Sequence, residues 1–241
     1  MNLFRIKIAD QTFEIHAGYK GTSAWCSDYV TDDEPTSTIK MVQQDIIKEK
    51  KHFSNAESKT NLSGSYLEYM ALLRKLTEEM IDNRILLMHG AAIGLHDNAY
   101  IFTAPSGTGK TTHILKWLKS CPDAIVINGD KPFLKFCDNG SILVCGSPWA
   151  GKEYMQTNTM MPLKSIILME RAEENQIQKI NFSEASPFIL KQIYRPDDAE
   201  KMHTTIHLIQ HLQQVIQIYR FQCNNYKNDC FDVAYHALVQ E

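Results

Sequence analysis

Residues 104–112 read Ala104-Pro105-Ser106-Gly107-Thr108-Gly109-Lys110-Thr111-Thr112 and form a glycine-rich loop. It follows a short apolar run, 99–103, that suits a buried strand, and it leads into a run, 112–118, with apolar residues at helical spacing. A strand, a loop of this composition and a helix in this order are typical of a phosphate-binding loop. The alternative is a glycine-rich turn that carries a surface lysine.

The residue types of the loop suit a nucleoside triphosphate. Glycines let several backbone N–H groups point at one anion, and the positive end of the following helix faces the same anion. Lys110 would reach the β- and γ-phosphates, and the Thr111 hydroxyl would bind Mg²⁺. We therefore predict ATP and Mg²⁺ as cofactors, although GTP or pyrophosphate would suit the same amides. The residues expected to contact the nucleotide are Ser106, Gly107, Thr108, Gly109, Lys110, Thr111 and Thr112.

Composition is that of an ordinary soluble globular protein. The net charge of −3 over 241 residues does not favour nucleic acid as a partner. Apolar runs are too short to span a membrane, and the first 16 residues alternate instead of forming a signal peptide. We expect a cytoplasmic protein without nucleic-acid or membrane partners, with homo-oligomerisation left open. The spacing of the six scattered cysteines does not suit zinc, and in a cytoplasm they are expected to be reduced thiols, mostly small core residues.

Strands and helices intermix along the chain, which indicates an α/β fold with a mixed sheet. We expect one domain over 1–241, in which 1–83 forms an N-terminal region and 84–241 the nucleotide-binding core with the C-terminal elements. The N-terminal region should hold a hairpin over 3–15 and a polar loop over 28–61 with one helix inside it. A helix is expected over 67–82, with a capping box formed by Ser65 and Glu68.

The strand before the glycine-rich loop is predicted to be antiparallel to its predecessor. A strand over 85–95 and a second strand over 99–103 are joined by the tight turn His96-Asp97-Asn98. In most proteins with such a loop, a crossover helix makes this part of the sheet parallel. The remaining predictions are strands over 124–128, 133–136, 142–145, 165–170 and 215–221, and helices that start at Pro187 and Asp197.

Two further side chains are candidates for phosphoryl-transfer chemistry, which needs a metal and a group that orients or deprotonates the acceptor. Asp130 follows the buried strand 124–128, at the strand end where α/β proteins bind ligands, so it could bind Mg²⁺ or accept a proton. His89 interrupts an apolar run, where an unpaired imidazole is unfavourable. The alternatives are a plain turn at 128–130 and a hydrogen-bonded core histidine. The predicted catalytic residues are therefore Asp130, His89 and Lys110, and the predicted metal ligands are Thr111 and Asp130.

The loop 145–153 is a candidate for contact with the acceptor. It contains two glycines, Trp149 and the charge pair Lys152 and Glu153, and Lys152 could meet a phosphate or an acidic acceptor. The alternative is a plain connection anchored by Trp149. Elsewhere, His203, His207 and His211 recur every four residues, but without a flanking carboxylate or cysteine we interpret them as surface or half-buried helix residues.

The order of these motifs resembles that of the HPr serine kinase/phosphorylase family and its short phosphoenolpyruvate-carboxykinase-like relatives. The motifs are Met88-His89-Gly90-Ala91-Ala92, the glycine-rich loop, Gly129-Asp130 and Gly146-Ser147-Pro148-Trp149. The resemblance spans 85–153 and continues loosely through 193–196 and 218–221. This chain departs from the family at Ala104, where the first loop glycine is usual, and at Gly129, where the first of two adjacent acids is usual.

The resemblance implies a P-loop serine kinase. It places His89 and Asp130 beside the transferred phosphate, with Asp130 as base toward the acceptor serine and Thr111 helping to hold Mg²⁺. Some short relatives phosphorylate a serine of a ribosomally made peptide, which implies a peptide or small protein as the substrate. The alternatives are a regulatory or assembly ATPase without a phosphoacceptor, and a relative that has lost nucleotide affinity, as Ala104 would suggest.

Overall fold

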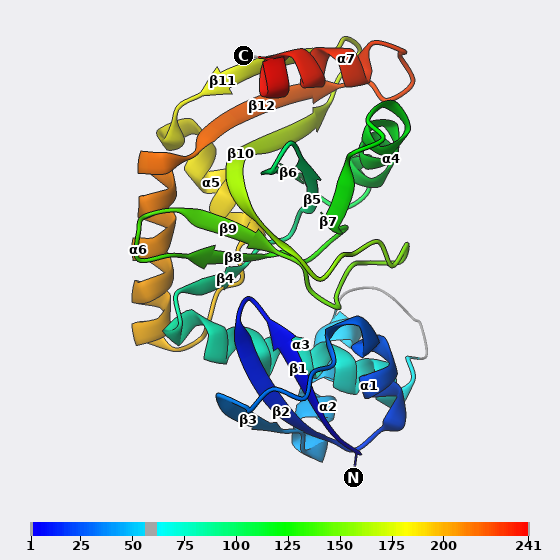
Figure 1. Ribbon diagram of the computed structural model, residues 1–241, viewed down its shortest axis with the longest axis vertical. Helices are drawn as coiled ribbons and strands as arrows, with labels where there is room; N and C mark the ends of the chain where they lie inside the picture. The colour runs from blue at the N-terminus through cyan, green and yellow to red at the C-terminus, as the bar shows by residue number, and fades with distance from the viewer. Residues whose placement is uncertain (1, 56–61, 241) are drawn as a thin grey trace. The chain divides into compact units, whose positions relative to one another are not determined.

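The chain forms two compact units, Met1–Asn83 and Arg84–Glu241. The computed structural model describes residues 2–55 and 62–240, and Figure 1 shows them as helices and strands. Each unit has its own sheet, three-stranded in the first unit and nine-stranded in the second. Among the described residues, no helix combines the length and the apolarity that crossing a membrane requires.

The N-terminal unit contains the predicted hairpin and one strand that was not predicted. β1 (Asn2–Ile8) and β2 (Gln11–Ala17) pair antiparallel, and β3 (Ser37–Lys40) pairs parallel with β2. The prediction of a loop over 28–61 with only a helix inside it is therefore wrong at β3, while 56–61 lies outside the described residues. Only Ile39 of β3 is buried, so this short strand has little hydrophobic periodicity. The helices of this unit are α1 (Lys20–Trp25), the short 3₁₀ turn η1 (Ser27–Tyr29), α2 (Gln43–Asn55) and α3 (Gly64–Asp82).

Helix α3 begins at a different cap from the predicted one. Ser63 is the N-cap, and its hydroxyl accepts a hydrogen bond from the Tyr66 N–H at 3.2 Å. The predicted capping box of Ser65 and Glu68 is wrong, because Glu68 faces inward and is only 1% exposed. Its carboxylate accepts hydrogen bonds from Gly18 N at 2.7 Å, Tyr19 N at 3.0 Å and Thr22 Oγ1 at 2.5 Å. The Ser-x-x-Glu spacing suits a capping box, but an inward-facing first turn has the same spacing.

Replacing Glu68 with Ala is expected to destabilise the N-terminal unit by about 2–4 kcal/mol, because three donors lose one charged acceptor. Urea unfolding of the full chain measures this, and amide exchange should show lost protection at Gly18 and Tyr19. Glu79→Ala is the matched control, because Glu79 is exposed on the same helix. Equal unfolding midpoints for the two variants would show that the buried carboxylate is not a structural anchor.

The C-terminal unit is built on a mixed sheet, so the predicted α/β class with a mixed sheet is confirmed. The strand order is β4-β8-β9-β10-β6-β5-β7, and β12 pairs with β10 and β11. Strand β6 is antiparallel to β5 but parallel to β10, and β10 is parallel to β12. The strands are β4 (Ile85–Leu87), β5 (Ala91–Leu95), β6 (Asn98–Thr103), β7 (Ile125–Asn128), β8 (Phe133–Phe136), β9 (Ile142–Cys145), β10 (Met160–Arg171), β11 (Gln176–Ile180) and β12 (Gln217–Cys223).

The predicted single strand over 85–95 is wrong, because the chain leaves the sheet at 88–90. Its first part, β4, pairs with β8, whereas β5 pairs with β6 and β7. Residues on both sides of the break are buried, so the apolar run gives no sign of it. At Gly90 a Cβ atom would lie 2.8 Å from Ile101 Cγ2, so the chain passes close to β6 here. The break matters because it places His89 outside the strands.

The helices of this unit are α4 (Lys110–Ser120), α5 (Phe182–Gln192), α6 (Ala199–Val215), α7 (Cys230–Tyr235) and the π-helical turn η2 (His236–Gln240). Two predicted helix starts are wrong. Pro187 lies inside α5, which is capped by Asn181, and α6 is capped by Asp198 instead of Asp197. Helix α4 buries Ile114 and Trp117 in the same apolar core as β6, and this packing fixes the start of α4 at the end of that strand.

Candidate active site

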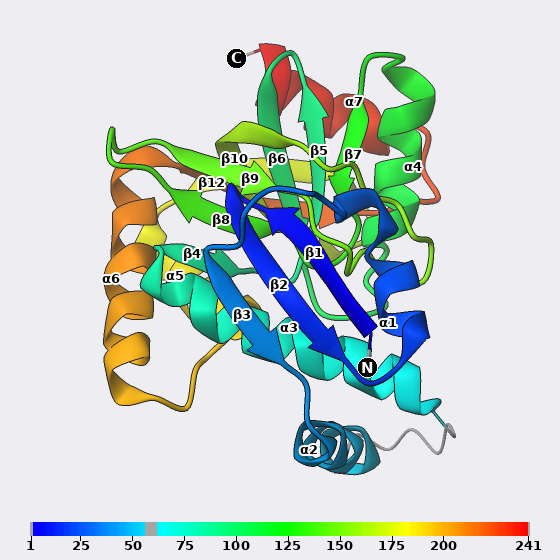
Figure 2. The same ribbon diagram turned by 60° about the horizontal axis from the view of Figure 1, so that its bottom comes forward.

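Several strands end at one edge of the sheet, and the candidate site lies in the loops that follow them. Strands β6, β10 and β12 are mutually parallel, and β7 runs in the same direction because both β6 and β7 are antiparallel to β5. In open α/β sheets, ligands bind at the carboxyl ends of such strands. The glycine-rich loop follows β6 and Asp130 follows β7. Figures 1 and 2 show α4, the helix after the loop, beside β7.

The glycine-rich loop has the backbone that its glycines allow. Gly107 and Gly109 have φ angles of +79° and +113°, where a side chain would be strained. Helix α4 begins at Lys110, directly after Gly109. The Lys110 side chain is only 9% exposed, and its Nζ donates hydrogen bonds to the carbonyls of Ala104 at 2.9 Å and Pro105 at 3.4 Å. The Lys110 side chain therefore reaches back across the glycine-rich loop to the first two residues of the loop.

Two side chains that sequence reasoning missed bind the carbonyl side of the loop. Arg171, at the end of β10, donates from Nη2 to the Gly107 carbonyl and from Nε to the Thr108 carbonyl at 3.5 Å. Asn225, just after β12, donates from Nδ2 to the Gly109 carbonyl at 3.1 Å. A trans peptide places its N–H opposite its C=O, so the N–H groups of Gly109 and Lys110 point away from these donors. This orientation leaves two amides at the start of α4 for an anion.

Asp130 is positioned by a turn and paired with two basic side chains. The buried Asn128 accepts hydrogen bonds through Oδ1 from the N–H groups of Asp130 at 2.8 Å and Lys131 at 2.6 Å. The alternative of an Asn-Gly-Asp turn is therefore correct as local structure, and the same turn orients the carboxylate. Oδ1 of Asp130 lies 3.3 Å from His89 Nε2, and Oδ2 lies 2.8 Å from Lys131 Nζ. The other ring nitrogen of His89 lies 2.9 Å from the Gln192 amide oxygen.

The charges of the site favour an ionised carboxylate. Burial would raise the pKa of Asp130, but the hydrogen bond with His89 and the charge of Lys131 outweigh it and lower the pKa to about 2. Burial lowers the pKa of Lys110, and the charge of Asp130 partly opposes this change. Thr103, the last residue of β6, donates from Oγ1 to the His89 carbonyl oxygen at 2.7 Å, which joins the His89–Asp130 pair to the strand that enters the glycine-rich loop. The structure pairs Asp130 with His89 and Lys131 and places Lys110 in the glycine-rich loop, and the catalytic roles of His89, Lys110 and Asp130 stay a prediction.

The loop 145–153 lies beside Asp130. A Cβ atom at Gly151 would be 3.2 Å from Asp130 Cβ and 3.9 Å from Glu153 Oε2. Trp149 is buried, so it anchors the loop, while Lys152 and Glu153 are exposed. Both interpretations of this loop therefore describe part of it, and contact with an acceptor stays a prediction.

Gly129, where the resemblance leads us to expect an acid, has no room for a side chain. At Gly129 a Cβ atom would lie 2.8 Å from the backbone oxygen of Ala150 and 3.3 Å from that of Met155. A carboxylate here would require the backbone of the neighbouring loop to move. Thr111 is half-buried in the first turn of α4, and Mg²⁺ binding by Thr111 and Asp130 stays a prediction.

The histidines of α6 are surface or half-buried residues, as interpreted from the sequence. His203 and His207 are exposed, with their Nε2 atoms 3.0 Å apart, and His211 Nε2 lies 3.0 Å from the Gly140 carbonyl oxygen. The last contact joins α6 to the β8–β9 hairpin turn. These residues are therefore explained by local surface contacts.

Comparison with known proteins finds matches among solved structures alone. No protein-family model and no curated protein matches the sequence. Among solved structures, the Hpr(Ser) kinase/phosphatase from Coxiella burnetii matches with a TM-score of 0.39 at 10% identity, over 64% of this chain and 97% of that chain.

Proposed function

We propose that this protein is an ATP-dependent kinase that transfers the γ-phosphoryl group to a hydroxyl, that of a serine in a peptide or small protein. One observation carries the proposal. A glycine-rich loop with a buried lysine follows β6, and an ionised Asp130 paired with His89 follows β7 at the same sheet edge, where Thr103 of β6 donates a hydrogen bond to the His89 carbonyl oxygen. Phosphoryl transfer needs this combination of an anion site and a group that orients the acceptor.

The loop residues would bind the triphosphate. The outward amides of Gly109 and Lys110 would donate to phosphate oxygens, and Lys110 Nζ would exchange its two carbonyl partners for the β- and γ-phosphates. Thr111 and Asp130 would hold Mg²⁺, which neutralises phosphate charge when bound. Arg171 keeps the carbonyls of Gly107 and Thr108 turned away from the anion.

Asp130 would act mainly by orientation. With a pKa of about 2 it is ionised at neutral pH and is a weak base in the free protein. Because the transition state of phosphoryl transfer is loose, the acceptor hydroxyl needs little deprotonation before attack. Asp130 would therefore accept the hydroxyl hydrogen bond and take the proton late. His89, 3.3 Å away, is a positioning residue for that carboxylate.

Acceptor dependence tests the proposal. The full chain is incubated with Mg²⁺, ATP labelled at the γ-phosphate and serine-containing peptides encoded next to its gene, each with a Ser→Ala partner peptide. The kinase proposal predicts label on the serine peptides and none on their partners. Release of labelled phosphate without labelled peptide would instead support the regulatory or assembly ATPase, because the glycine-rich loop fits both functions.

A further inference from the structure

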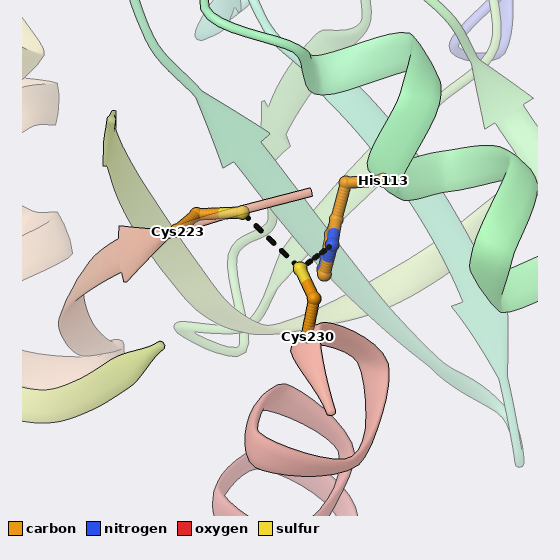
Figure 3. Close-up of side chains that lie close together, drawn as sticks. All are labelled: His113, Cys223 and Cys230. Carbon is orange, nitrogen blue, oxygen red and sulfur yellow. Dashed lines mark hydrogen bonds between the residues drawn. The ribbon is translucent and has the colours of Figure 1, made fainter. Parts of the chain in front are cut away.

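Behind the glycine-rich loop, three buried side chains converge that the proposed function does not use. His113 comes from α4, Cys223 from the end of β12 and Cys230 from the start of α7 (Figure 3). The two sulfur atoms are 3.2 Å apart, and Cys230 Sγ lies 3.4 Å from His113 Nδ1. His113 and Cys230 are 0% exposed and Cys223 is 5% exposed. Cysteine spacing in the sequence gave no sign of this cluster.

A metal site is the first alternative, because one ligand atom of each residue lies within 4.8 Å of the others. The position of the imidazole proton argues against it. Trp117 Nε1 lies 2.9 Å from His113 Nε2, and an indole N–H can only donate. Nε2 therefore carries the lone pair, and the neutral ring has its hydrogen on Nδ1, directed at Cys230. A metal-bound histidine needs the reverse, a lone pair toward the metal and an N–H on the far side.

We propose that Cys223 and Cys230 are a redox-active dithiol that a small hydroperoxide closes to a disulfide, with Cys230 as the attacking sulfur. Their separation of 3.2 Å must shorten to about 2.05 Å, a change within reach of side-chain rotation. Cys230 is the attacker because its sulfur faces the Nδ1–H of His113 as well as the Cys223 thiol. These hydrogen bonds, first that from Cys223, outweigh burial and lower the pKa of Cys230.

The chemistry balances with hydrogen peroxide as the oxidant. The Cys230 thiolate attacks one peroxide oxygen, the O–O bond breaks, and protonated hydroxide leaves as water, which makes a sulfenic acid on Cys230. The sulfur of Cys223 then attacks the sulfenic sulfur, loses its proton, and displaces the hydroxyl as a second water. Two electrons pass from the two thiols to the peroxide. Because both sulfurs are buried, a small oxidant is needed.

The dithiol is joined to the glycine-rich loop through Asn225. Its Oδ1 lies 3.5 Å from Cys223 Sγ and 3.4 Å from Cys230 Sγ, where it can accept a hydrogen bond from a thiol of the pair, and its Nδ2 donates to the Gly109 carbonyl at 3.1 Å. Disulfide formation removes the thiol hydrogens of the pair, so the Asn225 amide oxygen loses its donor opposite Gly109. We therefore expect oxidation to weaken nucleotide binding, and this consequence alone rests on the proposed function.

Peptide mapping tests the dithiol itself. The reduced full chain is treated with one equivalent of hydrogen peroxide, alkylated and digested without reductant. We expect a peptide pair linked through Cys223 and Cys230, two hydrogens lighter than the free thiols and released by dithiothreitol. The more exposed Cys121 and Cys137 should remain alkylated. Oxidation of Cys121 or Cys137 before the pair, or no linked peptide, would overturn the proposal.

Two matched variants identify the attacking sulfur. Cys223→Ser should stop at a sulfenic acid on Cys230 that dimedone traps. Cys230→Ser should react with hydrogen peroxide at least about 10-fold more slowly than Cys223→Ser. Equal rates would overturn the assignment of Cys230, and thermal melts check that both variants fold. Binding of one zinc ion that protects both thiols of the wild type from alkylation would overturn the dithiol in favour of a metal site.

Calorimetry on the reduced and oxidised chain tests the link to the loop. We expect the affinity for Mg-ATP to fall about 2- to 10-fold on oxidation, the effect of losing one neutral hydrogen bond. Unchanged affinity with a formed disulfide would overturn the link. A disulfide in a chain that binds no nucleotide in either state would leave the dithiol standing and overturn the proposed function instead.

Discussion

The Asp130→Asn variant is expected to bind Mg-ATP yet to transfer phosphate at least about 1,000-fold more slowly than the wild type. The amide preserves the size of the side chain and the backbone hydrogen bonds to Asn128. It removes the negative charge that faces His89 and Lys131 and that would accept the acceptor proton. Initial rates with labelled ATP measure the transfer, and calorimetry measures the binding.

Asp123→Asn is the matched control for this variant. Asp123 is exposed and lies shortly before β7, whereas Asp130 follows that strand. Transfer by the control should equal that of the wild type. If Asp130→Asn retained the wild-type rate, Asp130 would have no part in the chemistry.

The Lys110→Met variant is expected to lose affinity for Mg-ATP by about 100-fold, because a buried charge–phosphate contact contributes about 1.5–3 kcal/mol. Methionine suits the site, since the lysine stem is buried and only its amino group contacts the carbonyls of Ala104 and Pro105. Calorimetry with Mg-ATP measures the loss, and the urea midpoint checks the fold.

Lys119→Met provides the comparison, because Lys119 is exposed near the end of the same helix, α4. Its affinity should match that of the wild type. Equal affinities for the two variants would mean that the glycine-rich loop does not bind the triphosphate through Lys110.

Local signals in the sequence pointed to the glycine-rich loop and Asp130 as parts of the candidate site. The glycine-rich loop, the strand before it and the helix after it involve residues close in sequence, so spacing and composition suffice. Asp130 was found because it directly follows a buried strand. The β8–β9 hairpin formed as predicted from the Asn139-Gly140 turn, with Gly140 at a φ of +83°.

Features that depend on distant contacts were missed. The break between β4 and β5 arises because the two strands pair with different neighbours, while both are buried throughout. Glu68 matched a local cap pattern, but its partners lie about 50 residues earlier in the chain.

The supporting residues of the loop were missed for the same reason. Arg171 and Asn225 act on carbonyls 63 to 116 residues away in sequence. Cys223 and Cys230 lie seven positions apart, a spacing that matches no cysteine motif used in the prediction. His113 lies 117 positions before Cys230, so its part in the cluster has no local signal. Only the parallel order of β6, β10 and β12 brings these segments to one edge.

A crystal structure with Mg²⁺ and a non-hydrolysable ATP analogue would show where the triphosphate binds. We expect phosphate oxygens to accept hydrogen bonds from the N–H groups of Gly109 and Lys110, with Lys110 Nζ moved from the Ala104 carbonyl to the phosphates. We also expect the Asp130 carboxylate to face the terminal phosphate. A triphosphate bound elsewhere, or bound in the loop with Asp130 turned away, would show that this protein is not the proposed kinase.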